Sequence, residues 1–116
     1  MKNYLAVFLG SPDAMKEYMA QDEATRKEND KKGMVAWTNW MQEHKGDLVD
    51  GGGPLGKTLA VSKEGIKSVR NEMGAWTVVK ANSQEEAAKM FEGHPHFTIF
   101  PGDRVEVMEI LPIPKM

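Results

Sequence analysis

The sequence predicts an α+β domain with the ferredoxin-like βαββαβ order. Three observations predict it: an apolar strand pattern opens the chain, a helical stripe follows, and a strand–helix–strand set closes it. This is the split βαβ arrangement, in which two helices cover one face of a four-stranded antiparallel sheet. A length of 116 residues fits one domain, so residues 1–116 are expected to fold as a single unit.

The first strand is predicted over residues 2–9 (KNYLAVFL), which are apolar on both alternating faces and end at Gly10. Residues 11–13 (Ser-Pro-Asp) are typical of a helix start, so a short helix is expected to follow. Residues 21–32 show no apolar periodicity. They are expected to form a loop or a solvent-exposed helical turn.

The clearest helix signal begins at Met34. Apolar and aromatic side chains recur at steps of three, four and three residues, and Trp40 flanks this stripe. Gly46 suits the position just after the helix end. The stripe consists of Met34, Trp37, Met41 and His44.

Further strands are predicted at residues 58–62 and 76–81, after a glycine-rich turn that follows residues 48–50. Residues 83–86 form a capping box, which predicts a helix ending at Gly93.

The last strand is predicted over residues 104–111. Its apolar side chains fall on one face of the strand at first and on the other face later, which indicates a bulge or two covered faces.

Two helices cover only one face of such a sheet. The alternate face is also apolar, and we place Tyr4, Ala6, Phe8 and Val78 on it. Because exposed apolar faces usually mark interfaces, a homodimer that packs sheet face against sheet face is expected.

Composition excludes several classes of function. The chain has 15 Lys and Arg against 17 Asp and Glu and lacks a long basic block, so no nucleic-acid partner is expected. The absence of cysteine removes thiol catalysis and Cys-based zinc sites. No apolar run is long enough to cross a membrane and no secretion signal is visible, so a cytoplasmic location is expected.

Residues 51–58 (GGGPLGKT) match the phosphate-binding pattern GxxxxGK[ST]. That loop must follow a buried parallel strand and open a helix. Here Thr58 begins an alternating, strand-like pattern, and Gly65 interrupts the helical alternative. We therefore favour a glycine-rich connection between two strands, with nucleotide binding as the competing hypothesis.

His94 and His96 stand just past the predicted helix end, where either imidazole can act as a general acid or base. Ordinary loop histidines are the competing interpretation. Asp50, or Asp47, is the candidate carboxylate that would assist them. With no cysteine and no assured third ligand, no metal and no cofactor are expected. Three aromatic residues are candidates for lining a ligand pocket or for simple core packing: Trp37, Trp40 and Trp76.

The order and spacing of several segments resemble the YCII-related (DGPF-like) proteins: residues 2–5, 37–41, 52–58, 76–87, 94–97 and 105–108. The resemblance implies a ferredoxin-like fold that forms a dimeric α/β barrel, with the glycine-rich stretch as a family loop. It also implies a His/Asp pair as the acid/base site, and the relatives of similar fold isomerise or dehalogenate small lactone rings. His94 stands where these proteins often have the Asp of an Asp-Pro-Phe motif.

The sequence therefore predicts a small-molecule-binding domain, with His94, His96 and Asp50 as the acid/base group acting on a small organic acid or lactone. The alternative is a non-catalytic binding or regulatory module that acts as a homodimer. Whether the protein is an enzyme is left open at this point.

Overall fold

The computed structural model describes residues 1–114, so the last two residues of the predicted domain lie outside it. Its elements follow the chain in this order: β1 (Lys2–Gly10), α1 (Pro12–Met19), α2 (Glu23–Glu43), β2 (Leu48–Pro54), β3 (Thr58–Ser62), β4 (Gly65–Val69), β5 (Met73–Ala81), α3 (Gln84–Lys89), α4 (Pro95–Thr98) and β6 (Gly102–Glu109).

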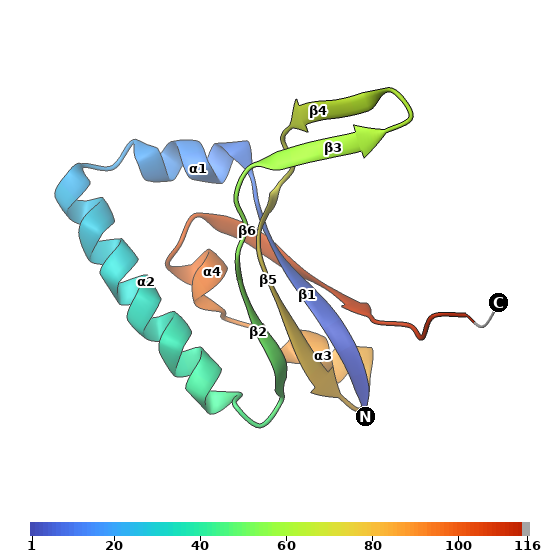
Figure 1. Ribbon diagram of the computed structural model, residues 1–116. Helices are drawn as coiled ribbons and strands as arrows, with labels where there is room; N and C mark the ends of the chain where they lie inside the picture. The colour runs from blue at the N-terminus through green and yellow to red at the C-terminus, as the bar shows by residue number, and fades with distance from the viewer. Residues whose placement is uncertain (115–116) are drawn as a thin grey trace.

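Strands β2, β5, β1 and β6 lie in that order in one antiparallel sheet, with β1 between β5 and β6. This is the strand order of the ferredoxin-like fold, so the predicted α+β class is confirmed (Figure 1). The strand that comes second along the chain in this sheet, however, is β2 and not the predicted strand at 58–62. The predicted strand at 58–62 pairs with β4 in a separate two-stranded hairpin.

Of the two alternatives expected for residues 21–32, the loop is wrong and the solvent-exposed helix is right, because α2 begins at Glu23 and continues through this segment. Asp22 caps the helix by accepting a hydrogen bond from the Thr25 N–H at 2.8 Å. Ion pairs one turn apart, such as Glu23–Lys27 at 3.3 Å, support its exposed side. Apolar periodicity reports burial, and this half of α2 lies in solvent.

The two helix starts predicted from capping residues are confirmed, whereas the helix predicted from Met34 begins at Glu23. The Ser11 Oγ accepts from the Ala14 N–H at 3.1 Å, and the Ser83 Oγ accepts from the Glu86 N–H at 3.2 Å. The Glu86 carboxylate reaches back to the N–H of Asn82, one residue before the cap. Helix α3 ends at Lys89, and turns carry the chain to Gly93, whose φ is +68°.

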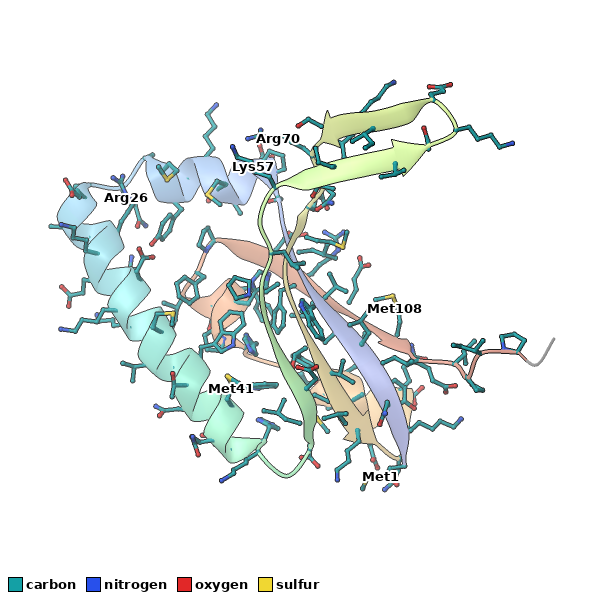
Figure 2. The ribbon with its side chains drawn as sticks, viewed as in Figure 1. Met1, Arg26, Met41, Lys57, Arg70 and Met108 are labelled. Carbon is teal, nitrogen blue, oxygen red and sulfur yellow. The ribbon has the colours of Figure 1, made fainter. Side chains whose placement is uncertain are left out.

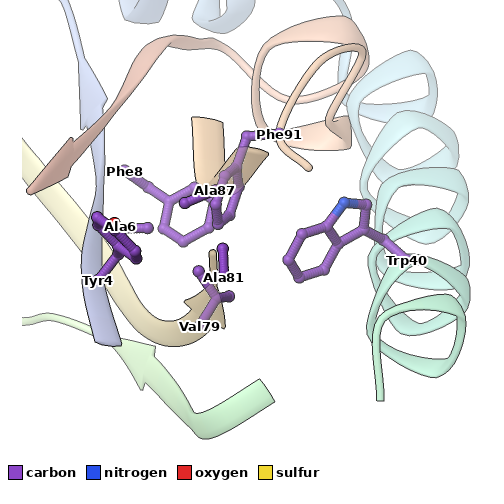
Figure 3. Packing of buried hydrophobic residues seen from close by; sticks show 8 residues of the cluster. All are labelled: Tyr4, Ala6, Phe8, Trp40, Val79, Ala81, Ala87 and Phe91. Carbon is purple, nitrogen blue, oxygen red and sulfur yellow. The ribbon is translucent and has the colours of Figure 1, made fainter. Parts of the chain in front are cut away.

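The hydrophobic core lies between the sheet and helices α2 and α3 (Figures 1 and 3). Tyr4, Ala6 and Phe8 are buried in it, so their placement on the open face of the sheet is wrong. The sequence shows only that they share a face of β1. The face that the helices cover depends on which side of the sheet the connections from β1 to β2 and from β5 to β6 pass.

The open face of the sheet carries the alternate residues of the same strands. Leu5 pairs with Val78 of β5 on one side and with Met108 of β6 on the other. Because side chains alternate along strands, these three share the face that no helix covers. Met108 keeps 42% of its surface exposed. The apolar open face is therefore present, and of the four residues predicted on it only Val78 lies there.

The β3–β4 hairpin projects away from the sheet, and its side chains point into solvent (Figures 1 and 2). Exposed apolar residues lie on both strands, including Val61 and Ile66. The Cα radius of gyration is 16.2 Å, whereas about 13 Å is expected for a compact chain of this length. The projecting hairpin contributes to this extended shape. No helix within residues 1–114 is long and apolar enough to cross a membrane.

Strand β2 is irregular where its glycines pass β5. The pairing shifts register between Leu48 and Asp50 and again between Asp50 and Gly53. Gly52 has φ +63°, and a Cβ added there would lie 1.8 Å from the Trp76 carbonyl oxygen. The close approach of the two backbones requires glycine at this position.

We predict that Gly52→Ala destabilises the fold by about 2 kcal/mol or more, because the methyl group clashes with the β5 backbone and alanine disfavours positive φ. Gly53→Ala is the matched control. Nothing lies within 4 Å of its Cβ position, so a change below about 1 kcal/mol is expected. Urea unfolding measures both variants, and equal losses would contradict the close approach.

Candidate functional site

A cavity of about 460 Å³ opens between α2 and the β2–β5 edge of the sheet. Aromatic and apolar side chains form most of its wall, and a single titratable side chain, that of His96, lines it. The principal lining side chains are Phe8, Met34, Trp37, Trp40, Met41 and Phe100, together with His96. The cavity thus has the composition of a site for an apolar or aromatic small molecule.

The helix and the glycines create this space together. Trp37 and Met41 stand one turn apart on α2 and face the sheet. Opposite them, residues 51–53 of β2 are all glycine, so no side chain fills the gap. A Cβ at Gly51 would lie 3.2 Å from the Met41 Cε. The glycine-rich segment therefore forms a wall of the cavity.

This segment is not a phosphate-binding loop. Residues 51–54 belong to the antiparallel strand β2, and Thr58 starts another strand instead of a helix. The nucleotide-binding hypothesis required a helix at this point and is therefore wrong.

His96 lies on the short helix α4 with its ring half-buried at the cavity wall. Its Nε2 lies 2.8 Å from the Leu9 carbonyl oxygen, which can only accept, so Nε2 carries the proton. A Cβ at Gly102 would lie 2.3 Å from this Nε2, so glycine is required for the ring to fit. Nδ1 then keeps its lone pair, forms no hydrogen bond within residues 1–114 and is not shut away from solvent.

Burial lowers the pKa of His96 below its ordinary value. The carbonyl groups of Leu9 and Arg104, and the charge of Asp103, oppose this shift without cancelling it. His96 is therefore neutral at neutral pH, with a basic Nδ1. This is the protonation state that a general base requires.

His94 is fully buried and directly adjacent to this group. Its Nδ1 accepts a hydrogen bond from the His96 backbone N–H at 2.9 Å, which caps α4. The ring packs edge-on against Trp37 and Trp40, with ring centroids 4.5 Å and 4.8 Å away. Since Nδ1 accepts, the proton is on Nε2, a buried donor with no hydrogen-bond partner within residues 1–114.

Burial, as the largest cause, together with the charges of His96 and His44 lowers the pKa of His94 to about 3. His94 therefore stays neutral across the physiological range. It does not line the cavity, and its position suits a role in holding α4 and His96 in place.

The structure does not bring Asp50 to the histidines. Its exposed carboxylate accepts from the Gly52 N–H at 2.9 Å within β2, and Asp50 does not line the cavity. The carboxylate whose negative charge raises the pKa of His96 is that of Asp103. Within residues 1–114, no group of three or more His, Asp or Glu is placed to hold a metal ion.

The three tryptophans occupy different positions. Trp37 lines the cavity and lies 4.9 Å from the Phe8 ring centroid. Trp40 also lines it, while its Nε1 donates to the Met90 carbonyl at 2.8 Å, which ties α2 to the end of α3. The main chain of Trp76 borders the cavity beside Gly52, and strand alternation directs its indole to the open face.

Sequence reasoning missed Phe8 and Phe100 as lining residues. Phe100 closes the cavity end by lying over α2, where a Cβ at Gly33 would come within 2.5 Å of its ring. The predicted helix began at Met34, one residue after Gly33, so no sequence pattern marked this glycine as a point of close contact. Nothing in the sequence paired it with Phe100.

Comparison with solved structures finds the same fold in 5-chloro-2-hydroxyhydroquinone dehydrochlorinase (TftG) from Burkholderia phenoliruptrix AC1100, solved in complex with 2,5-dihydroxybenzoquinone. The TM-score is 0.51 at 15% identity, over 90% of this chain and 89% of that one. At this identity the likeness shows the fold alone. No family model and no curated protein sequence matches the chain. The YCII resemblance therefore stays a prediction.

We predict that stability falls as the pH drops from 6.5 towards 3. The unfolded chain protonates His94 in this window while the folded chain does not, so protonation favours unfolding. One such group gives a slope of about 1.4 kcal/mol per pH unit. Denaturant unfolding against pH measures the slope, and His94→Asn, which keeps a capping acceptor, should reduce it.

The ¹⁵N shifts of the His94 ring give a second readout. They should not change between pH 8 and pH 4. A midpoint near the ordinary value of 6.5 would contradict the burial of a neutral imidazole.

Proposed function

We propose that the cavity beside α2 binds a small, planar organic molecule and that His96 transfers a proton to and from it. The observation that carries this proposal is the pairing of an aromatic-walled space of about 460 Å³ with one titratable group, His96, whose basic Nδ1 forms no hydrogen bond within the described residues 1–114. Such a wall stabilises a flat ring by stacking and apolar contact.

The proton transfer uses groups of this chain alone. An acidic O–H or C–H of the bound molecule gives its proton to Nδ1, and its electron pair stays on the substrate as an enolate or phenolate. The imidazolium that forms keeps its Nε2–H bonded to the Leu9 carbonyl, and the Asp103 charge favours it. Return of the proton to another atom of the substrate gives isomerisation, whereas loss of a leaving anion gives elimination.

His94 acts in this scheme as a positioning residue. Its hydrogen bond from the His96 N–H fixes the backbone that carries the general base. Because its pKa is about 3, it does not compete for the proton.

The substrate class is a small organic acid, a lactone or a hydroxylated ring, and the reaction is isomerase- or dehalogenase-like. The neighbour of the same fold is a dehydrochlorinase solved with a dihydroxybenzoquinone, which supports a flat oxygenated ring as ligand. Membership of the YCII-related family and a cytoplasmic location belong to the same proposal.

A second candidate is a non-catalytic binding module that acts as a homodimer. The open sheet face favours self-association, since Leu5, Val78 and Met108 form an apolar surface that no helix covers. Two copies packed face to face would complete a dimeric α/β barrel and bury this surface on both chains. The dimer is compatible with either function.

We predict that His96→Gln lowers turnover about 100-fold or more while binding stays within about threefold, because a positioned general base contributes at least that factor. The assays are deuterium uptake from D₂O into a five-membered enol lactone and chloride release from 5-chloro-2-hydroxyhydroquinone. Quenching of tryptophan fluorescence by the same compounds measures binding at Trp37.

His44→Gln is the control, because His44 stacks on Trp40 at 4.5 Å outside the cavity and should keep the wild-type rate. Equal rate losses in both variants would contradict the role of His96. Binding without turnover in the wild type would favour the non-catalytic module, and the absence of both would refute the cavity as a site.

We predict that the protein in solution has twice the chain mass of 13.0 kDa and that Met108→Lys makes it monomeric by placing charges in the apolar interface. Light scattering coupled to size exclusion measures the mass. Val35→Lys is the control, since Val35 is also an exposed apolar residue, but on α2. A monomeric wild type, or dissociation in both variants, would count against sheet-to-sheet packing.

A further inference from the structure

A second cavity, of about 530 Å³, lies on the other side of His96. Three residues line both cavities: Gly74, His96 and Phe100. His96 therefore stands at the boundary between the aromatic cavity and the second cavity.

The second cavity differs from the first in its charges. Arg70 lines it, and the guanidinium group forms no ion pair or hydrogen bond with any part of residues 1–114. The other two arginines are engaged: Arg26 donates to the Met19 carbonyl, and Arg104 pairs with three carboxylates. An unpaired guanidinium in a cavity wall is available to an anionic ligand group.

Lys57 adds a second positive charge beside Arg70. Thr58 pairs with Val69 across the hairpin, so the residue before Thr58 and the residue after Val69 flank the same end of the ladder. Figure 2 labels both side chains at this neck of the hairpin. Asn71 fixes the neck, because its Nδ2 donates to the Thr58 Oγ1 at 3.0 Å and its Oδ1 accepts from the Met73 N–H.

One carboxylate also lines this cavity, that of Glu72, and it would repel an anion. Glu72 is held by Arg104, whose guanidinium lies 3.3 Å from the Glu72 Oε2 and also pairs with Asp103 and Glu106, so one positive charge serves three carboxylates. Of the charged side chains on the cavity wall, that of Arg70 is the one without an ion-pair partner among the described residues.

We propose that the second cavity binds a carboxylate carried by the ligand, with Arg70 as its partner and Lys57 as a supporting charge. This rests on the proposed function, in which the ring of the ligand occupies the aromatic cavity. The planar guanidinium fork matches a carboxylate with two parallel hydrogen bonds. The ligand class narrows to an aromatic or unsaturated ring acid that spans His96.

The test uses probes with the same dihydroxylated ring that differ in the carboxylate and in the length of its linker. Hydroquinone is compared with 2,5-dihydroxybenzoate, 2,5-dihydroxyphenylacetate and 3-(2,5-dihydroxyphenyl)propanoate, which place the carboxylate progressively further from the ring. At least one acid should bind the wild type about tenfold more tightly than hydroquinone. Arg70→Gln should remove this advantage while leaving hydroquinone binding unchanged.

Lys63→Gln is the matched control, since it removes the same charge from the turn of the same hairpin, away from the cavity. It should leave every affinity unchanged. Equal loss in Arg70→Gln and Lys63→Gln would show a general charge effect and overturn the carboxylate site.

A separate titration with acetate, followed by the ¹⁵N shift of the Arg70 Nε, distinguishes the two proposals. A shift at Arg70 with no ring binding would refute the aromatic cavity and keep the anion site. Ring binding with no acid advantage and no Arg70 shift would refute the anion site and keep the cavity. If neither ring binding nor an Arg70 shift is observed, this inference and the proposed function are both overturned.

Discussion

The burial of neutral His94 among aromatic rings is the constraint on which the rest of the site depends. Phe8 of β1 and Trp37 and Trp40 of α2 surround the ring, so the imidazole joins the sheet to the long helix. The same imidazole accepts the His96 N–H and thereby sets the start of α4. A charged His94 would be expelled from this packing, and its strongly lowered pKa expresses that cost.

The two neighbouring histidines show how environment separates the roles of identical side chains. His94 has no access to the cavity, and its one accepting nitrogen is already used by the backbone. His96 is held at Nε2 by the Leu9 carbonyl, and its other nitrogen is free at the wall. Tautomer and orientation are therefore fixed by main-chain partners, which leaves one defined atom for chemistry.

The fold leaves a cavity beside β2 unfilled and an apolar surface exposed, and both bear on function. Three successive glycines in β2 leave the cavity unfilled, and the bulged pairing with β5 requires one of them at Gly52. On the outside, the hairpin and the open sheet face leave apolar residues exposed, such as Val61 and Met108. A single copy of the chain does not bury them, which is the physical argument for a second copy.

The sequence by itself determined the fold class, the two capped helix starts at Ser11 and Ser83, and His94 and His96 as candidate site residues, because capping and periodicity are local properties. It could not determine which face of β1 meets the helices, or that α2 begins at Glu23 in solvent, because burial depends on distant segments. Only the tertiary structure decided that Asp50 lies away from the histidines, that His94 is buried while His96 is accessible, and that Arg70 shares a wall with His96. These are contacts between residues far apart in the chain, and local patterns do not encode them.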